Sequence, residues 1–195
     1  VRPYRRRGRK PRKKGSAKRF FPNLLKTNYP THPHHIWASD FTYIPFHGKF
    51  LYLATVVDLF TREVVGWSVL TNHSSQLILA AIFPALNYHP KPDIFHSDNG
   101  REYDSNIFIK TLTEFGIHIS RSAKSSPWEN GYQESFYSQF KVDLGDPERF
   151  KTLGELVYEI HRLIWRYNHT RIHSALKMPP IVFAKQCQKL IERVS

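Results

Sequence analysis

The spacing of apolar and polar residues predicts three neighbouring strands early in the chain. Residues 36–46 are rich in β-branched and aromatic side chains. After the turn His47-Gly48-Lys49, residues 50–60 are almost continuously apolar, which is typical of a strand covered on both faces. The turn Thr61-Arg62-Glu63 then leads into residues 64–70. Because both turns are short, we expect an antiparallel three-stranded meander.

The remainder of the chain alternates helical and strand patterns. Ser74-Ser75 can cap a helix whose apolar residues recur at the helical period until His89-Pro90. The same reasoning predicts strands at 93–97 and 117–120 and helices at 106–115, 132–144, 153–167 and 180–194. A strand that returns parallel needs a helical crossover, so this order predicts an α/β protein. We expect a ribonuclease-H-like mixed five-stranded sheet with helices on both faces.

Charge is concentrated at the amino end of the chain. The 195 residues include 29 Lys or Arg and 16 Asp or Glu, for a formal net charge of +13. Twelve of the basic residues and none of the acidic ones lie in residues 1–26, so the rest is almost neutral. This distribution predicts a polyanion partner. Residues 1–26 show no periodicity and are interpreted as a flexible basic linker, with a nonspecific solubilising tail as the alternative.

Cysteine content and hydropathy indicate the compartment. A single cysteine, Cys187, excludes a disulfide framework within one chain and a cysteine-rich zinc site, which favours a reducing cytosol. No apolar run approaches the roughly 18 residues that span a bilayer, and no apolar stretch follows the basic start. We therefore expect a cytoplasmic protein without a membrane partner. Because the sequence starts at Val1 within the basic stretch, we also expect a piece of a longer chain.

Three carboxylates stand out from these patterns. Asp40 lies within a predicted strand, Asp98 follows a short strand, and Glu134 falls in the first turn of a predicted helix. Each has an ordinary explanation, because Asp40 can accept local hydrogen bonds, Asp98 can form a turn and Glu134 can compensate a helix dipole. On strand ends and a helix of one sheet, however, all three can converge. Such acids repel one another unless divalent cations neutralise them.

Magnesium fits this ligand set, because it prefers hard oxygen ligands and completes its shell with water and substrate phosphate. Two such ions about 3.5–4 Å apart activate an attacking oxygen and stabilise a leaving oxygen at phosphorus. The carboxylates therefore indicate phosphodiester chemistry.

Four motifs in order resemble those of one protein family. From about Tyr29 to Gln186, the chain resembles bacterial insertion-sequence transposases of the Orf-B type, the third numbered insertion-sequence family, within the retroviral-integrase superfamily. Thirty-five residues separate Asp98 from Glu134, which is the spacing of this family. The motifs are residues 37–43 (WASDFTY), 96–103 (HSDNGREY), 126–136 (SPWENGYQESF) and 167–176 (YNHTRIHSAL), followed by Pro179 and Phe183.

The resemblance implies a DNA transposase that frees the 3′ end of its element and joins it to a target phosphodiester. It implies that Asp40 and Asp98 bridge two Mg²⁺ ions, with Mn²⁺ as a substitute, and that Glu134 completes the coordination of one ion. These three residues would be both catalytic and metal-binding. The catalytic core would span residues 31–187, between a basic arm at 1–30 and a helix end at 188–195. A homodimer or higher even assembly is expected on DNA, because two element ends must be joined to one target.

DNA contacts are expected from the arm, from Asn130 and from Lys141. For Lys141 an ordinary solvated lysine is the alternative, and His96 is interpreted as structural. Arg171 and His173 suit packing or phosphate binding equally. The arm residues expected to track DNA phosphates are Arg5, Arg6, Arg7, Arg9, Lys10, Arg12, Lys13 and Lys14.

Three other functions fit part of the pattern. A noncatalytic DNA-binding or assembly module would keep the fold, although it does not require intact carboxylates. A cellular ribonuclease H or Holliday-junction nuclease would share the sheet and the metals without the four motifs. An RNA-binding protein would explain the basic arm and leave the acids unexplained.

Overall fold

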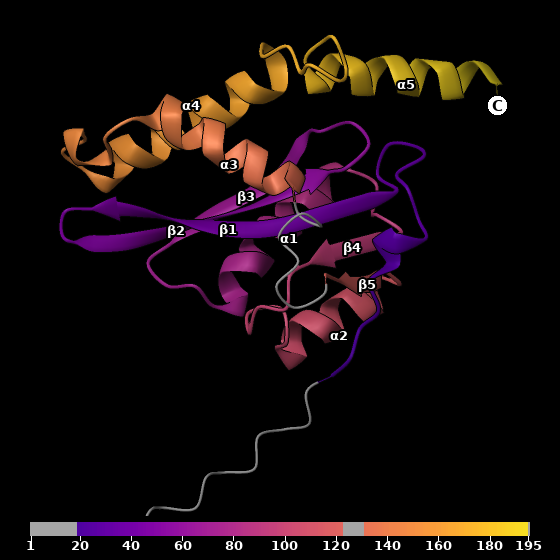
Figure 1. The fold of residues 1–195 in the computed structure, drawn as a ribbon, viewed down its shortest axis with the longest axis horizontal. Coiled ribbons are helices and arrows are strands. Elements are labelled where there is room, and N and C mark those ends of the chain that lie inside the picture. Colours follow the sequence, from indigo (N-terminus) through magenta and orange to yellow (C-terminus); the bar gives the residue numbers. More distant parts are fainter. Residues whose placement is uncertain (1–18, 123–130, 195) are drawn as a thin grey trace, which may run out of the picture.

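One five-stranded sheet organises residues 19–122 and 131–194, the part of the chain that the computed structural model describes (Figure 1). Strands β1 (Ile36–Phe46), β2 (Lys49–Asp58) and β3 (Val64–Leu70) form an antiparallel meander. Strands β4 (Ile94–Ser97) and β5 (His118–Arg121) continue the sheet parallel to β1, in the order β3-β2-β1-β4-β5. The predicted mixed ribonuclease-H-like sheet is therefore confirmed.

Helices cover both faces of this sheet. On one face lie α1 (Ser75–Tyr88) and α2 (Asn106–Glu114), and on the other lie α3 (Gly131–Leu144) and α4 (Leu153–His169) (Figure 1). Helix α5 (Pro180–Val194) contacts α4. The predicted bounds of these helices agree within two residues. The short 3₁₀ helices η1 (Leu24–Lys26) and η3 (Pro147–Arg149) were not predicted, because a single turn shows no period.

The described helices include none that is long and apolar enough to cross a membrane.

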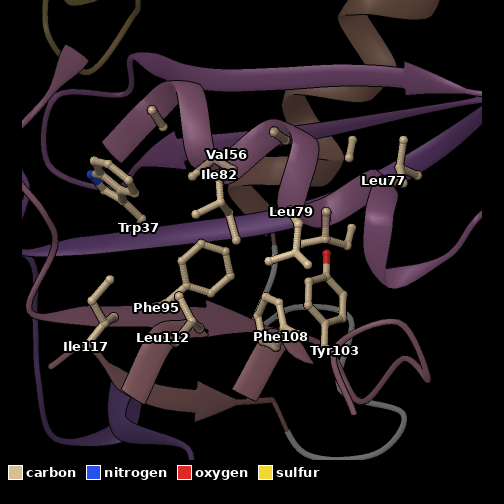
Figure 2. Packing of buried hydrophobic residues seen from close by; sticks show 14 of the residues in the cluster. Trp37, Val56, Leu77, Leu79, Ile82, Phe95, Tyr103, Phe108, Leu112 and Ile117 are labelled. Carbon is tan, nitrogen blue, oxygen red and sulfur yellow. The ribbon is translucent and has the colours of Figure 1, made fainter. Parts of the chain in front are cut away.

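The sheet separates two apolar cores. On the α1–α2 face, Ala54 and Val56 of β2 join a cluster that includes Trp37 (Figure 2). On the α3–α4 face, Leu53 and Val57 of the same strand pack with side chains from both helices. Alternate residues of β2 thus enter opposite cores, which explains its nearly continuous apolar run.

The segment before β1 corrects the predicted extent of the flexible linker. That prediction covered residues 1–26, but Leu24 packs against an apolar cluster at the sheet, and its backbone N–H donates to Ser120 Oγ at 2.9 Å. The carbonyl of Pro22 accepts from the backbone N–H of Arg121 at 3.0 Å, so the segment covers the edge strand β5. An edge strand needs partners for its open backbone groups, and this need is invisible in the charge pattern.

A buried acid lies between β2 and β3. Glu63 is only 7% exposed, and its burial together with the charge of Asp58 raises its pKa from 4.5 to about 7 against the attraction of Lys185. A carboxyl whose folded pKa is raised contributes stability below its unfolded pKa, and this contribution is lost as pH rises through the folded pKa. Glu63 should therefore destabilise the fold progressively between pH 4.5 and pH 7.

We expect Glu63→Gln to remove this pH dependence. Relative to the unmodified chain, the free energy of unfolding of the variant should increase by at most about 3 kcal/mol between pH 4.5 and 8. Urea unfolding at a series of pH values measures this difference, and Glu114→Gln on the surface of α2 serves as the control. A difference that stays constant across the range would show that Glu63 does not titrate there.

Candidate active site

Asp40 and Asp98 lie on neighbouring parallel strands. Asp40 is within β1, opposite Thr55 of β2, and Asp98 directly follows β4. Strands β1 and β4 are paired with Ala38 opposite His96. Two residues further along each strand, Asp40 is therefore level with Asp98. The parallel crossover thus brings together two acids that are far apart in the sequence.

A backbone N–H orients each of these carboxylates. Asp40 Oδ1 accepts from the N–H of Phe41 at 2.8 Å, and Asp98 Oδ1 accepts from the N–H of Gly100 at 2.9 Å. A Cβ at Gly100 would lie 2.7 Å from Glu102 Oε2 and 2.9 Å from Asp98 Oδ1. A side chain at position 100 would therefore displace the carboxylates of Glu102 and Asp98 from these positions.

Two polar side chains that flank Glu134 attach α3 to the sheet. Gln133 is fully buried; its Nε2 donates to a backbone carbonyl of β1 at 2.7 Å, and its Oε1 accepts from Thr55 Oγ1 at 3.0 Å. One turn later, the hydroxyl of Tyr137 donates to the carbonyl of Asp40 at 2.6 Å. Positions 133 and 137 share the helix face against β1, and Glu134 lies beside them with an exposed side chain.

Asp98 and Glu134 are both close enough to Asp40 to affect it electrostatically. Burial, reinforced by the charges of Asp98 and Glu134, raises the pKa of Asp40 from 3.8 to about 7. Burial also raises the pKa of Asp98, with a further contribution from Glu102 and an opposing one from Arg121. The backbone hydrogen bond that each aspartate accepts acts against the increase. The structure thus brings together the three acids that the sequence singled out.

Other polar residues around these acids were not identified from the sequence. Arg121 is 2% exposed, pairs with Asp104 and donates to the carbonyl of Tyr103 at 2.6 Å. Glu102 is paired with His73, with Oε1 and Nδ1 2.6 Å apart. The sequence does offer a signal for Arg121, because it is a basic residue at the end of a short strand. On α3, positions 133 and 137 are four residues apart and so share one helix face, which is a similar signal that both side chains meet the sheet.

The donor set suits a divalent cation. Three carboxylates supply the hard oxygen ligands that Mg²⁺ prefers. The raised pKa of Asp40 reflects its burial first and then the repulsion of Asp98 and Glu134, which a cation would relieve. In the described chain, the group of potential ligands whose atoms already lie within 4.8 Å of one another is a different one, formed by His32 and His35 before β1 and Asp93 before β4.

The remaining predicted site residues lie on α3, in β4 or outside the described part of the chain. Lys141 is exposed on α3, two turns after Glu134, with Nζ 4.9 Å from the ring centroid of Tyr43. His96 is buried in β4 with Nδ1 2.9 Å from Ser120 Oγ, in agreement with the structural interpretation. Asn130 and the arm residues Arg5, Arg6, Arg7, Arg9, Lys10, Arg12, Lys13 and Lys14 lie outside the described residues.

A mixed sheet with acids at adjacent strands and on a flanking helix defines the class of integrase-type cores. Two families described as integrase core domains match residues 30–127 and 115–180. The first match alone covers half of the chain, and the chain belongs to the integrase core domain family.

Within this family, the chain is similar to insertion-sequence transposases. It is 37% identical over 159 residues to the transposase for insertion sequence element IS904 of Lactococcus lactis subsp. lactis (strain IL1403), covering 80% of this chain and 63% of the relative. It is 34% identical over 156 residues to transposase InsF for insertion sequence IS3A of Escherichia coli (strain K12), covering 78% and 54%. The predicted resemblance is confirmed. The chain spans less than two thirds of the length of these relatives.

Solved structures confirm the fold. The HTLV-2 integrase catalytic core domain in complex with magnesium aligns with a TM-score of 0.66 at 22% identity, covering 80% of this chain and 99% of that one. The simian T-cell lymphotropic virus intasome in complex with PP2A regulatory subunit B56 gamma gives a TM-score of 0.70 at 19% identity, covering 78% and 55%.

Proposed function

We propose that this chain is the catalytic region of a DNA transposase that cleaves the 3′ ends of its element and joins them to target DNA. The observation that carries this proposal is the convergence of Asp40, Asp98 and Glu134 from β1, β4 and α3 in a chain of the integrase core family. A module that only binds DNA has no use for a buried aspartate with two further acids close enough to raise its pKa. Burying an ionised acid beside other acids lowers the stability of the fold, and such groups are typically found at functional sites.

In this proposal Asp40, Asp98 and Glu134 would together hold two Mg²⁺ ions. The presence of magnesium in the HTLV-2 core supports the choice of metal, and Mn²⁺ is the expected substitute because it accepts similar ligands. Ions held there would supply Lewis-acid chemistry for the attacking and leaving oxygens of a displacement at phosphorus. The chain itself holds the carboxylates in place through Gln133 and Tyr137.

DNA is the proposed partner, and three parts of the chain are proposed to contact it. The exposed Lys141 lies two turns after Glu134 and is available to a phosphate. Asn130 immediately precedes α3, and the basic arm contributes the largest charge. On DNA we propose a homodimer or higher even assembly, because joining two ends requires two active sites in fixed relation. Sedimentation of an active end complex that contains one protomer would contradict the assembly.

The experiment that tests the function is a strand-transfer assay on labelled DNA that carries the ends of the element, with Mg²⁺ and with a chelator as control. We expect metal-dependent release of 3′ ends and their joining to target DNA. DNA binding without cleavage would favour the noncatalytic module. Cleavage of RNA–DNA hybrids without joining would favour a ribonuclease H.

Gln133 is expected to act as a positioning residue for Glu134. Gln133→Met keeps the side-chain volume and removes both buried hydrogen bonds, so α3 should shift relative to β1. We expect kcat for strand transfer to fall about 10–100-fold with little change in KM, because a displaced ligand affects the transition state more than DNA binding. Gln186→Met, at an exposed position of α5, is the control. An unchanged kcat would remove Gln133 from this role.

A further inference from the structure

A cavity of about 370 Å³ opens beside α3 and is not part of the three-carboxylate site. Its lining comes from separate segments of the chain, with Arg62 from the β2–β3 turn, Ser135 from α3, Tyr167 from α4, and Arg171 and His173 from the loop that follows. No acidic residue of the described chain lines it. Ser135 directly follows Glu134, so one helix turn contributes to both the cavity and the candidate active site.

Cationic groups converge on this cavity. Burial, followed by the charges of Arg62 and Arg171, lowers the pKa of His173. The same two arginines oppose the effect of burial on Tyr167, whose pKa is raised to about 12. Both guanidinium groups therefore lie near the same two side chains. The buried Nδ1 of His173 has no hydrogen-bond partner in the described part of the chain.

Arg171 keeps donors for a further ligand. Its Nη1 is 3.4 Å from Asp143 Oδ2, a long contact between two partly exposed side chains. Ion pairs of this kind are weak, and a guanidinium carries five N–H donors in a planar fork. The contact with Asp143 therefore leaves most of the fork available to another acceptor.

The turn that carries Arg62 is built around one buried carboxylate. Asp58 is fully buried and accepts from the N–H of Phe60 at 2.9 Å and from Thr61 Oγ1 at 3.0 Å. Its carbonyl accepts from the N–H of Arg62 at 2.8 Å, and Arg62 has a left-handed φ of 65°. A non-glycine residue in this conformation is held there by its surroundings. The backbone position of Arg62 is thus firmly set.

The loop that carries His173 is closed in a similar way. Its backbone N–H donates to the carbonyl of Met178 at 3.1 Å, and its own carbonyl accepts from the N–H groups of Leu176 and Lys177 at 3.1 and 2.8 Å. Lys177 has a left-handed φ of 60°. Backbone turns therefore place the two sides of the cavity independently of any ligand.

We propose that this pocket binds a phosphodiester of the reacting DNA strand, away from the phosphate at which the reaction takes place. Two guanidinium groups, an imidazole and the Ser135 hydroxyl form a set of donors suited to phosphate oxygens, whereas the absence of lining carboxylates in the described chain disfavours a metal ion. This proposal rests on the proposed function, because Glu134 and Ser135 are adjacent and a strand at one must pass near the other. The pocket would set the register of DNA relative to the metal ions.

The test combines protein variants with DNA in which single phosphates are replaced by neutral methylphosphonates. In the full protein bound to end DNA, one replacement should weaken binding about tenfold or more, as expected for a lost charge-assisted contact. At that same position, Arg171→Gln and His173→Gln should each be clearly less sensitive to the replacement than the unmodified protein. Arg149→Gln, which removes the same charge at the opposite end of the sheet, should remain fully sensitive.

Two outcomes overturn the proposal. In the first, every phosphate replacement weakens binding of both variants as much as it weakens binding of the unmodified protein, which still performs metal-dependent strand transfer. The pocket then does not bind DNA, although the proposed function stands. In the second, inorganic phosphate stabilises the unmodified protein but not His173→Gln, while no phosphate replacement in the DNA distinguishes the variants from the unmodified protein. The pocket is then a site for free anions. Should Arg171→Gln fail to fold, His173→Gln decides alone, because a glutamine retains a donor and leaves both arginines in place.

Discussion

Replacing Asp40, Asp98 or Glu134 by Ala should reduce strand transfer by about a thousandfold or more, while DNA affinity remains within a few-fold of the unmodified protein. The metal ions act mainly on the developing charge in the transition state, so losing one ligand affects chemistry far more than binding. Single-turnover strand transfer and equilibrium DNA binding, measured on the same preparations, separate the two effects. Asp146→Ala, at an exposed position outside the site, is the matched control.

A stability measurement shows whether the Asp40 variant has simply unfolded. Because burial and neighbouring acids raise the pKa of Asp40 from 3.8 to about 7, Asp40 destabilises the metal-free fold progressively between these pH values and fully above them. Asp40→Asn should therefore be inactive and yet show a higher Tm than the unmodified metal-free protein at pH 8. Retained strand transfer in any of the three variants would exclude that residue from the site.

Deleting residues 1–19 should weaken DNA binding by orders of magnitude at low salt. The twelve basic residues of 1–26 include eleven in this stretch, and each neutralised phosphate releases counterions. If about six phosphates are contacted, log affinity should fall against log salt concentration with a slope near −5, and the deletion should flatten this slope markedly. Binding isotherms at a series of salt concentrations measure both quantities.

A second arm variant separates charge from length. Changing the eleven basic residues of 1–19 to Gln keeps the chain length and removes the same charge, so its slope should match that of the deletion. An unchanged slope in both variants would show that the arm does not contact DNA. DNA binding would then belong to the folded core, where Lys141 and the Arg62–Arg171–His173 pocket are the candidates.

The secondary structure was readable from the sequence because its signals are local. The apolar run of β2 and the helical period of α1 arise from contacts that recur every two or every three to four residues. The helical crossovers that follow from this order then require β4 and β5 to be parallel to β1. The covered edge of β5 was not readable, since residues 22 and 24 meet residues 120 and 121 across a long sequence separation.

The sequence by itself determined the order of elements, the basic arm and the three acids, because periodicity, charge and motif spacing are properties of neighbouring residues. Only the tertiary structure decided how those acids are held. Gln133 and Tyr137 look like ordinary helix residues until the sheet places Thr55 and the carbonyl of Asp40 beside them. The β2–β3 turn also brings Arg62 to the same cavity as Arg171 and His173, and this meeting of distant segments supports the proposed phosphate pocket. Hydrogen bonds and charges between distant segments depend on three-dimensional proximity, which no local pattern encodes.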